Sequence, residues 1–411
     1  MELFYVLLVL LVVTRAFGIA AERLGQPALI GELIAGIALG ALGASLAPAH
    51  PYIGDINHNE VFVAITDLGM FFLMLLAGIE MQPHKIIQYS GGALMVALGG
   101  MALPLALGVG LGWGFLPESE AKLAQCLFIG IALAITAVPA TVRILMDLGQ
   151  LTTRVGQTII SAAVFDDIFS LILLAWLTGL LTFGEPLGFA DVALLFGKIA
   201  LFFVITTLVG VYVFPRGGRL MHYLKARELE ISAVLAAAFA FAVLAEWLEL
   251  HFIVGAFVAG LYFGRRTIDA ESYERVKSAV SAMTFGFLAP IFFASIGFNL
   301  DLGALIGAPV FAGLLIACAF FGKIAGAGGA ARAAGFSARD AAAIGVGMSP
   351  RGAVELVIAG IALEAGLFEV VGTDNRIVEN LFSAVVVMAV VTTVLSPIIL
   401  KRVFSSGNDS A

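Results

Sequence analysis

Long apolar runs, separated by short polar or charged clusters, fill this chain from one end to the other. Runs of about 20 apolar residues can cross a bilayer as helices. A backbone in lipid must satisfy its own hydrogen bonds, which favours helices for runs of this length. The pattern predicts about thirteen transmembrane helices in one membrane domain, an all-α polytopic fold. The predicted helices cover residues 2–20, 27–46, 61–80, 90–115, 122–148, 152–182, 189–214, 226–248, 250–265, 273–298, 303–331, 337–365 and 377–403.

Composition supports this class. Of the 411 residues, 61% are hydrophobic and 12% are charged, whereas soluble domains carry about 25% charged residues. These values exclude a soluble enzyme, a nucleic-acid binder and a disulfide scaffold, and the two cysteines give no metal framework. The glycine run at 108–114 lies inside a predicted span, so it is not a nucleotide-binding loop. We therefore expect no enzymatic activity, no cofactor and no nucleotide partner.

The 22 Lys and Arg residues predict the orientation. Seventeen fall on one set of alternating loops and only Lys122 and Arg376 on the other, which is a strong positive-inside signal. The N-terminus is expected outside and the C-terminus in the cytoplasm, most simply in a bacterial inner membrane. The first apolar run lacks a basic flank and a cleavage site, so we interpret it as a mature span. No soluble regulatory domain is expected after Arg402.

Two prolines interrupt predicted spans at comparable positions in the two halves. Pro139 lies in ITAVPATVR and Pro350 lies in GVGMSPRGAVE. Broken helices in corresponding halves are typical of inverted-repeat transporters, whose site lies where the breaks cross. We expect unwound backbone at 136–140 and 348–352. The predicted repeats cover about 2–182 and 226–403, joined by a linker helix at about 189–214.

Asp166 and Asp167 are the most informative residues, because uncharged residues surround them deep in a predicted span. A charge at that depth costs about 2.5–3.5 kcal/mol on insertion scales. Basic partners could neutralise both acids for structural reasons alone. The favoured interpretation is a cation and proton site, in which one acid faces the ion and the other faces a cationic partner. Lys323 is the predicted partner, although a lysine can also snorkel to the membrane surface.

Arg351 and Glu355 follow the second break and are one helical turn apart. At this spacing they can simply pair with each other. Alternatively, they support the broken helices, whose carbonyl ends can coordinate a cation.

The segments QPALIGELIAGIALG, ITAVPATVRILMDLGQLTTRVGQ, AAVFDDIFSLILLA, FFGKIAGA and VGMSPRGAVELVIAG resemble the monovalent cation:proton antiporters of the second family. This family includes the NapA-type sodium/proton antiporters and the KefC-type potassium systems, and the Asp-Asp pair resembles the NapA branch. The resemblance implies thirteen helices with crossed breaks, a core domain, a dimerisation domain and elevator-like alternating access. It assigns ion binding to Asp167 and pairing with Lys323 to Asp166. The chain departs from the family at Ala137, where many relatives have Ser, and at Ala353, with the acid displaced to Glu355.

The sequence therefore predicts a homodimeric secondary antiporter that exchanges Na⁺, or Li⁺, for protons. Its predicted cation- and proton-binding residues are Asp166, Asp167, Lys323 and Thr136, with the two aspartates as Na⁺ ligands; Pro139, Pro350, Arg351 and Glu355 are the predicted supporting residues. K⁺/H⁺ exchange is the nearest alternative. A sodium-coupled organic-anion symporter and a gated cation channel are alternatives from other classes.

Overall fold

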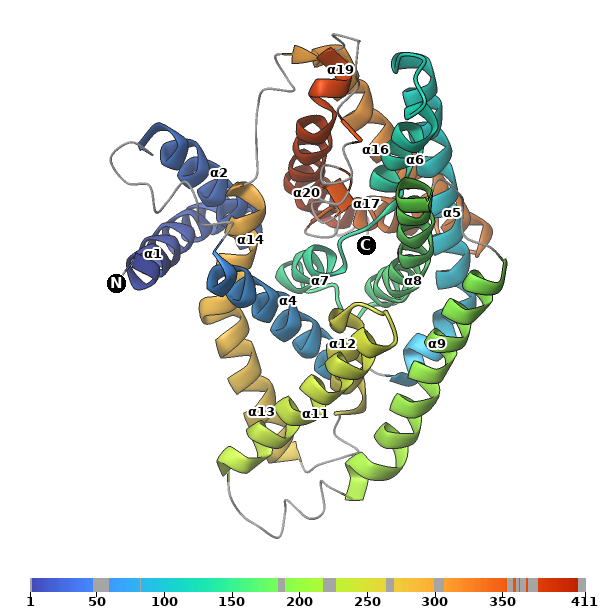
Figure 1. Cartoon of the computed structure of the whole chain (residues 1–411). Coiled ribbons are helices and arrows are strands. Elements are labelled where there is room, and N and C mark those ends of the chain that lie inside the picture. The colour runs from blue at the N-terminus through green and yellow to red at the C-terminus, as the bar shows by residue number, and fades with distance from the viewer. Residues whose placement is uncertain are drawn as a thin grey trace. The chain divides into compact units, whose positions relative to one another are not determined.

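The structure is a computed structural model that describes residues 2–46, 59–81, 83–183, 189–216, 227–263, 270–298, 307–352, 358–359, 362, 367–368 and 376–405. Within these residues all regular elements are helices, which confirms the predicted fold class (Figure 1). The main helices are α1 (Glu2–Arg23), α2 (Ala28–Leu46), α4 (Glu60–Glu80), α5 (Pro83–Phe115), α6 (Lys122–Ala134), α7 (Val138–Asp147), α8 (Arg154–Phe183), α9 (Phe189–Leu208), α11 (Arg227–Trp247), α12 (Phe252–Tyr262), α13 (Ala270–Met283), α14 (Ala289–Phe298), α16 (Pro309–Ala333), α17 (Ala338–Gly347), α19 (Arg376–Glu379) and α20 (Leu381–Ser405).

Ten of the described helical segments are long and apolar enough to cross a membrane, and 28–41 and 252–262 are shorter apolar helices. These twelve segments match twelve of the thirteen predictions. In the remaining prediction, 337–365, α17 ends at Gly347 and residues 348–352 are not helical. Of residues 353–365 the structure describes only 358–359 and 362, which are helical.

Two π-helical segments interrupt spans that were predicted as regular helices. They are η2 (Val209–Val213) and η3 (Thr284–Leu288). The wider turn of a π-helix changes the local hydrogen bonding, and Phe285 O in η3 accepts a hydrogen bond from the Arg15 guanidinium of α1. The apolar pattern gave no signal for either segment.

The chain divides into two compact units, each drawn from several parts of the sequence. Unit 1 consists of Met1–Ala16, Leu42–Gln88 and Phe189–Ser295. In it α4 packs closely on α12, because glycines face each other across the contact. A Cβ on Gly78 would lie 2.2 Å from Phe257 O, and one on Gly260 would lie 2.4 Å from Leu75 O. Small residues at such positions allow helices to approach closely in membranes.

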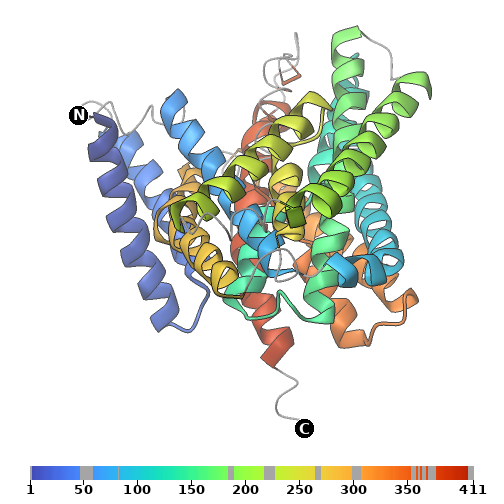
Figure 2. The same cartoon turned by 90° about the horizontal axis from the view of Figure 1, so that it is seen from below.

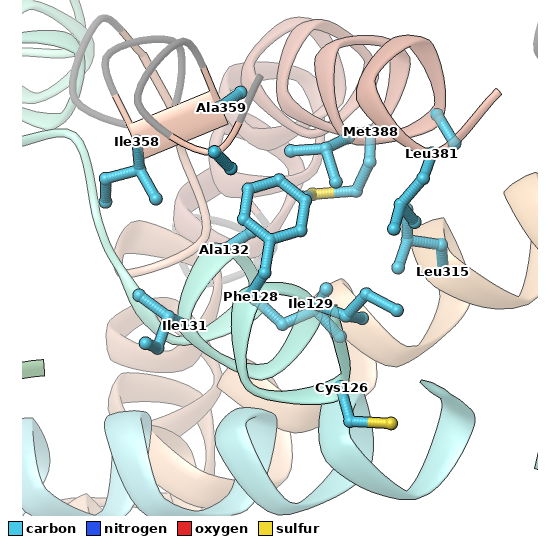
Figure 3. Packing of buried hydrophobic residues seen from close by; sticks show 14 of the residues in the cluster. Cys126, Phe128, Ile129, Ile131, Ala132, Leu315, Ile358, Ala359, Leu381 and Met388 are labelled. Carbon is cyan, nitrogen blue, oxygen red and sulfur yellow. The ribbon is translucent and has the colours of Figure 1, made fainter. Parts of the chain in front are cut away.

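Unit 2 consists of Phe17–Ala41, Tyr89–Gly188 and Ile296–Ala411, and it contains all the described residues predicted for the site. Its helix α16 packs against α6, α17 and α20, while α8 packs against α6, α7 and α17. An apolar cluster fills the space between α6, α16 and α20, with Phe128, Leu315, Leu381 and Met388 among its buried members (Figure 3). This packing fixes the position of α16, which carries Lys323.

Both predicted breaks exist. The first separates α6 from α7, leaving Ile135 to Ala137 outside the helices, and the second follows the end of α17 at Gly347. The second break matches the predicted range of 348–352. The first prediction, 136–140, was wrong for its last three residues, because α7 already begins at Val138. Pro139 lies in the first turn of α7, where the missing N–H of proline costs nothing and its fixed φ favours the helix.

Candidate functional site

The two breaks, although more than 200 residues apart in the sequence, are joined by hydrogen bonds. Ala137 N donates to Pro350 O at 2.9 Å. Thr136 Oγ1 donates to Met348 O at 3.0 Å, and Thr141 Oγ1 to Gly347 O at 3.2 Å. Carbonyls at the end of α17 and just after it therefore accept hydrogen bonds from the first break and from α7. This arrangement brings the end of α6 and the end of α17 to one place inside unit 2.

Lys323 joins the first break to α8. Its ammonium donates to Thr136 Oγ1 at 2.7 Å and to Ala134 O, and it lies 3.4 Å from Asp166 Oδ2. Both side chains of this ion pair are fully buried. The pair that the sequence predicted is thus present, but the lysine lies closer to the helix end than to the carboxylate.

Arg351 makes the corresponding contacts from the second break. Its side chain is fully buried, and Nη1 donates to Ala132 O at 2.8 Å and to Ile135 O. Its backbone N donates to Thr393 Oγ1 of α20 at 2.8 Å. Glu355, its predicted alternative partner, lies outside the described residues. Arg351 is therefore fixed across the crossing, against the end of α6.

Two buried cations thus meet the C-terminal end of α6. The unpaired carbonyls of a helix end carry a partial negative charge, which cations stabilise. Lys323 donates a hydrogen bond to one carbonyl at this end of α6, and Arg351 donates to two others. The sequence suggested that such carbonyls would face a cation. In this structure protein donors bind them instead, since a buried helix end needs partners of its own.

Asp166 and Asp167 lie side by side in α8 but in different surroundings. Asp166 is fully buried, and its Oδ1 accepts no hydrogen bond from the described part of the chain. Asp167 is half-buried. Consecutive helical residues point about 100° apart, so one acid can face Lys323 while its neighbour faces elsewhere. The pairing of Asp166 with Lys323 is as expected from the sequence, and ion binding by Asp167 stays a prediction.

The far end of α7 is anchored by a second set of charges. Arg143 Nη2 lies 3.5 Å from Glu32 Oε1 of α2, and Arg143 Nε lies 3.0 Å from Asp147 Oδ1. The Arg143 and Glu32 side chains are buried. These contacts hold the short helix α7 at the end opposite the break.

The structure brings together Asp166, Lys323, Thr136 and Arg351 at the crossing, with Asp167 next to Asp166. Pro350 contributes its carbonyl, and Pro139 starts α7. Sequence reasoning missed Thr141 and Thr393, which bind the two breaks. Hydroxyl residues inside otherwise apolar runs were the signal that could have identified them. Across the described residues no three His, Cys, Asp or Glu side chains cluster as a metal site.

Comparison with known proteins identifies the family. The transmembrane sodium/hydrogen exchanger family matches residues 6–406. The chain belongs to this family. It is 32% identical to the Na⁺/H⁺-K⁺ antiporter GerN of Bacillus cereus, over 98% of this chain and 97% of that protein. It is 28% identical to a Na⁺/H⁺ antiporter of Enterococcus hirae, over 98% of both chains.

The fold of this exchanger also matches solved structures. The sodium proton antiporter MjNhaP1 of Methanocaldococcus jannaschii superposes with a TM-score of 0.66 over 98% of this chain and 97% of that chain, at 17% identity. The family and fold confirm the predicted antiporter resemblance and an all-helical membrane protein. They support Na⁺/H⁺ antiport as the general activity of this exchanger.

Gly352 allows the two breaks to approach each other closely. A Cβ at this position would lie 2.9 Å from the Cβ of Ala137, which is closer than carbon atoms pack. We expect Gly352→Ala to push the breaks apart, destabilise the exchanger by about 1–3 kcal/mol and slow ion exchange. Gly329→Ala is the matched control, because a Cβ there meets nothing within 4 Å. Thermal unfolding and exchange assays compare the two; equal behaviour would show that the crossing tolerates separation.

Proposed function

We propose that this exchanger trades Na⁺, or Li⁺, for protons at the Asp167 carboxylate by elevator-like alternating access. The observation that carries the proposal is the buried Asp166–Lys323 pair at the crossing of two broken helices, with Asp167 next to it in α8. Charges are retained inside a membrane bundle at a high cost, and they mark ion and proton pathways. The relatives named above transport Na⁺ and H⁺ according to their names.

Exchange follows from competition for one carboxylate. A proton and a largely dehydrated Na⁺ cannot both neutralise Asp167, so a proton arriving on one side expels the cation there. A carboxylate loaded with either ion crosses more easily than an empty one, because an uncompensated charge is costly at that depth. The two ions are therefore carried in opposite directions by the same site.

We propose that Lys323 adds a second proton and makes transport electrogenic. Asp167 alone exchanges one Na⁺ for one H⁺, which moves no net charge. When Na⁺ binds, the Asp166–Lys323 contact loosens, and the lysine releases one proton to the open side and becomes a neutral amine. The 3.4 Å between Lys323 Nζ and Asp166 Oδ2 is longer than a typical N–H···O hydrogen bond. Ala134 O and Thr136 Oγ1 favour the charged ammonium, so these contacts must also loosen during proton release.

The oligomeric state, the membrane and the orientation of the exchanger are also proposals. We propose a homodimer in the cell membrane, with the N-terminus outside and the C-terminus in the cytoplasm. The asymmetric distribution of Lys and Arg over the loops supports this orientation. The only partner expected besides the second copy of the chain is the membrane lipid that surrounds the helices.

K⁺/H⁺ exchange is a second candidate, and one observation favours it. GerN, at 32% identity over nearly the full length, is named a Na⁺/H⁺-K⁺ antiporter. Position 137 is consistent with this candidate, because Ala137 stands where many relatives have Ser and so lacks a hydroxyl that could bind Na⁺. Ion identity therefore needs a direct measurement.

The test is dissipation of a pH gradient in everted vesicles, with Na⁺, Li⁺ and K⁺ added in turn. We expect Na⁺ and Li⁺ to dissipate the gradient, and vesicles without the exchanger to show no response. A response to K⁺ alone would replace the Na⁺ assignment with the K⁺ alternative. A gradient unaffected by all three ions would contradict antiport.

Replacing Pro139 with Ala should weaken cation binding several-fold. An alanine at 139 supplies an N–H that can bond to Ile135 O four residues back, where it competes with Arg351. The break would shorten, and the contacts of Arg351 and Lys323 at the end of α6 would shift together with the neighbouring ion site. The measurement is the apparent Na⁺ affinity in the vesicle assay, and an unchanged affinity would make Pro139 a passive start of α7.

A further inference from the structure

A group of exposed arginines surrounds the turn between α16 and α17 in unit 2. Arg332 lies at the end of α16, Arg339 at the start of α17 and Arg154 at the start of α8, and all three are exposed. Figure 2 shows this turn, the connection from α7 to α8 and the end of α20 on the same side of the unit. We name Arg154, Arg332 and Arg339 the turn arginines.

Contacts within unit 2 hold the turn arginines in place. Arg332 Nη1 donates to Phe336 O at 2.6 Å, and the Arg154 guanidinium lies 4.3 Å from the centre of the Phe336 ring. Arg339 Nε donates to Val403 O of α20 at 2.8 Å. Neither Arg332 nor Arg339 forms an ion pair within the described ranges. These contacts orient guanidinium groups whose remaining N–H donors can bind an anion.

An apolar stripe on α16 leads directly to this group. Val310 and Phe321 are 68% and 63% exposed. Val310, Phe321 and Arg332 follow one another at intervals of eleven residues, so they lie within about 20° per interval on one side of the helix. Phe321 lies about 16 Å along the helix axis from Arg332. Helix α16 therefore presents exposed apolar side chains on the side that ends at the Arg332 guanidinium.

The depth of the turn arginines in the membrane indicates which kind of anion they meet. The spans Pro309–Ala333 and Arg154–Leu174 end and begin at the turn arginines, so these side chains lie at the depth of lipid headgroups. The loops on this side carry seventeen of the 22 Lys and Arg residues, which predicts that the side is cytoplasmic. Basic residues at this depth attract anionic lipid headgroups.

We propose that the turn arginines bind the phosphate of an anionic phospholipid, such as phosphatidylglycerol, whose acyl chain lies along Phe321 on α16. A soluble phosphate ion shares the headgroup chemistry but has no use for the apolar stripe. Because α17 leads directly into the second break, a lipid here would steady the helix that carries one side of the ion site.

The test uses purified full-length protein in a neutral detergent, with phosphatidylglycerol or phosphatidylcholine added. We expect phosphatidylglycerol to raise Tm and to remain bound in native mass spectrometry, while phosphatidylcholine and inorganic phosphate do neither. High salt should weaken the binding. A Tm increase with inorganic phosphate equal to that with phosphatidylglycerol would overturn the lipid assignment, as would equal binding of both lipids.

Variants locate the site. Arg332→Gln with Arg339→Gln should weaken phosphatidylglycerol binding by about fivefold for each arginine removed. Arg376→Gln, an exposed arginine on the opposite set of loops, should have no effect. Arg332→Lys with Arg339→Lys keeps both charges and should retain binding, which guards against a folding defect in the glutamine variant. Wild-type binding by the glutamine variant, or loss of binding by the Arg376 variant, would contradict the proposal.

Discussion

Asp167→Asn is expected to abolish Na⁺-dependent dissipation of a pH gradient while the protein stays folded. A neutral amide does not bind or release a proton by titration at physiological pH, and it offers no full charge to a dehydrated cation. The fold should survive because Asp166, not Asp167, makes the buried pair with Lys323. The measurement is gradient dissipation in everted vesicles, with thermal unfolding as the check on folding.

Asp340→Asn is the matched control for this change. Asp340 lies in unit 2, in the first turn of α17, and removing its charge should leave exchange unchanged. Exchange by the Asp167 variant at the wild-type rate would place the ion site elsewhere. The same outcome would leave the family assignment intact, because that assignment rests on the whole chain.

Lys323→Gln is expected to have two effects. It leaves the fully buried Asp166 carboxylate without its cation, and breaking a buried pair in this way costs roughly 3–5 kcal/mol. It also removes the second proton, so any exchange that survives should carry no current. Thermal unfolding measures the first effect, and transient current after a Na⁺ jump in proteoliposomes measures the second.

Two further variants separate these effects. Lys122→Gln removes a buried lysine at the other end of α6, whose partner Glu118 is exposed, and it should not change the current. Lys323→Gln combined with Asp166→Asn removes both charges and should recover part of the lost stability. Full-size current from the single Lys323 variant would limit this lysine to a structural role.

The sequence predicted the helices well because membrane spans depend on length and hydrophobicity, which are local properties. It also predicted the Asp166–Lys323 pair, because a buried charge in lipid requires a partner and these two are deep in their spans. The second break was predicted at its observed position. The first was shifted, because Pro139 marks the beginning of the next helix and not the centre of the break.

The sequence could not show which group binds which carbonyl. Arg351 is one turn from Glu355 in sequence, yet in the structure it donates to Ala132 O and Ile135 O of α6. Such contacts join segments more than 200 residues apart, and neither propensity nor hydropathy encodes them. The π-helical segments η2 and η3 were also missed, because the apolar pattern of the sequence contains no signal for them.

The most direct test of the central claim is the binding of radioactive Na⁺ to purified protein at several pH values. If Na⁺ and H⁺ compete for the Asp167 carboxylate, the apparent Kd for Na⁺ should rise by at least about tenfold for each unit of acidification below the pH at which Asp167 binds its proton, and more steeply where Na⁺ also displaces the Lys323 proton. The Asp167→Asn variant should bind no Na⁺ at any pH. An apparent Kd that stays constant across this range in the wild-type protein would contradict competition at a shared site.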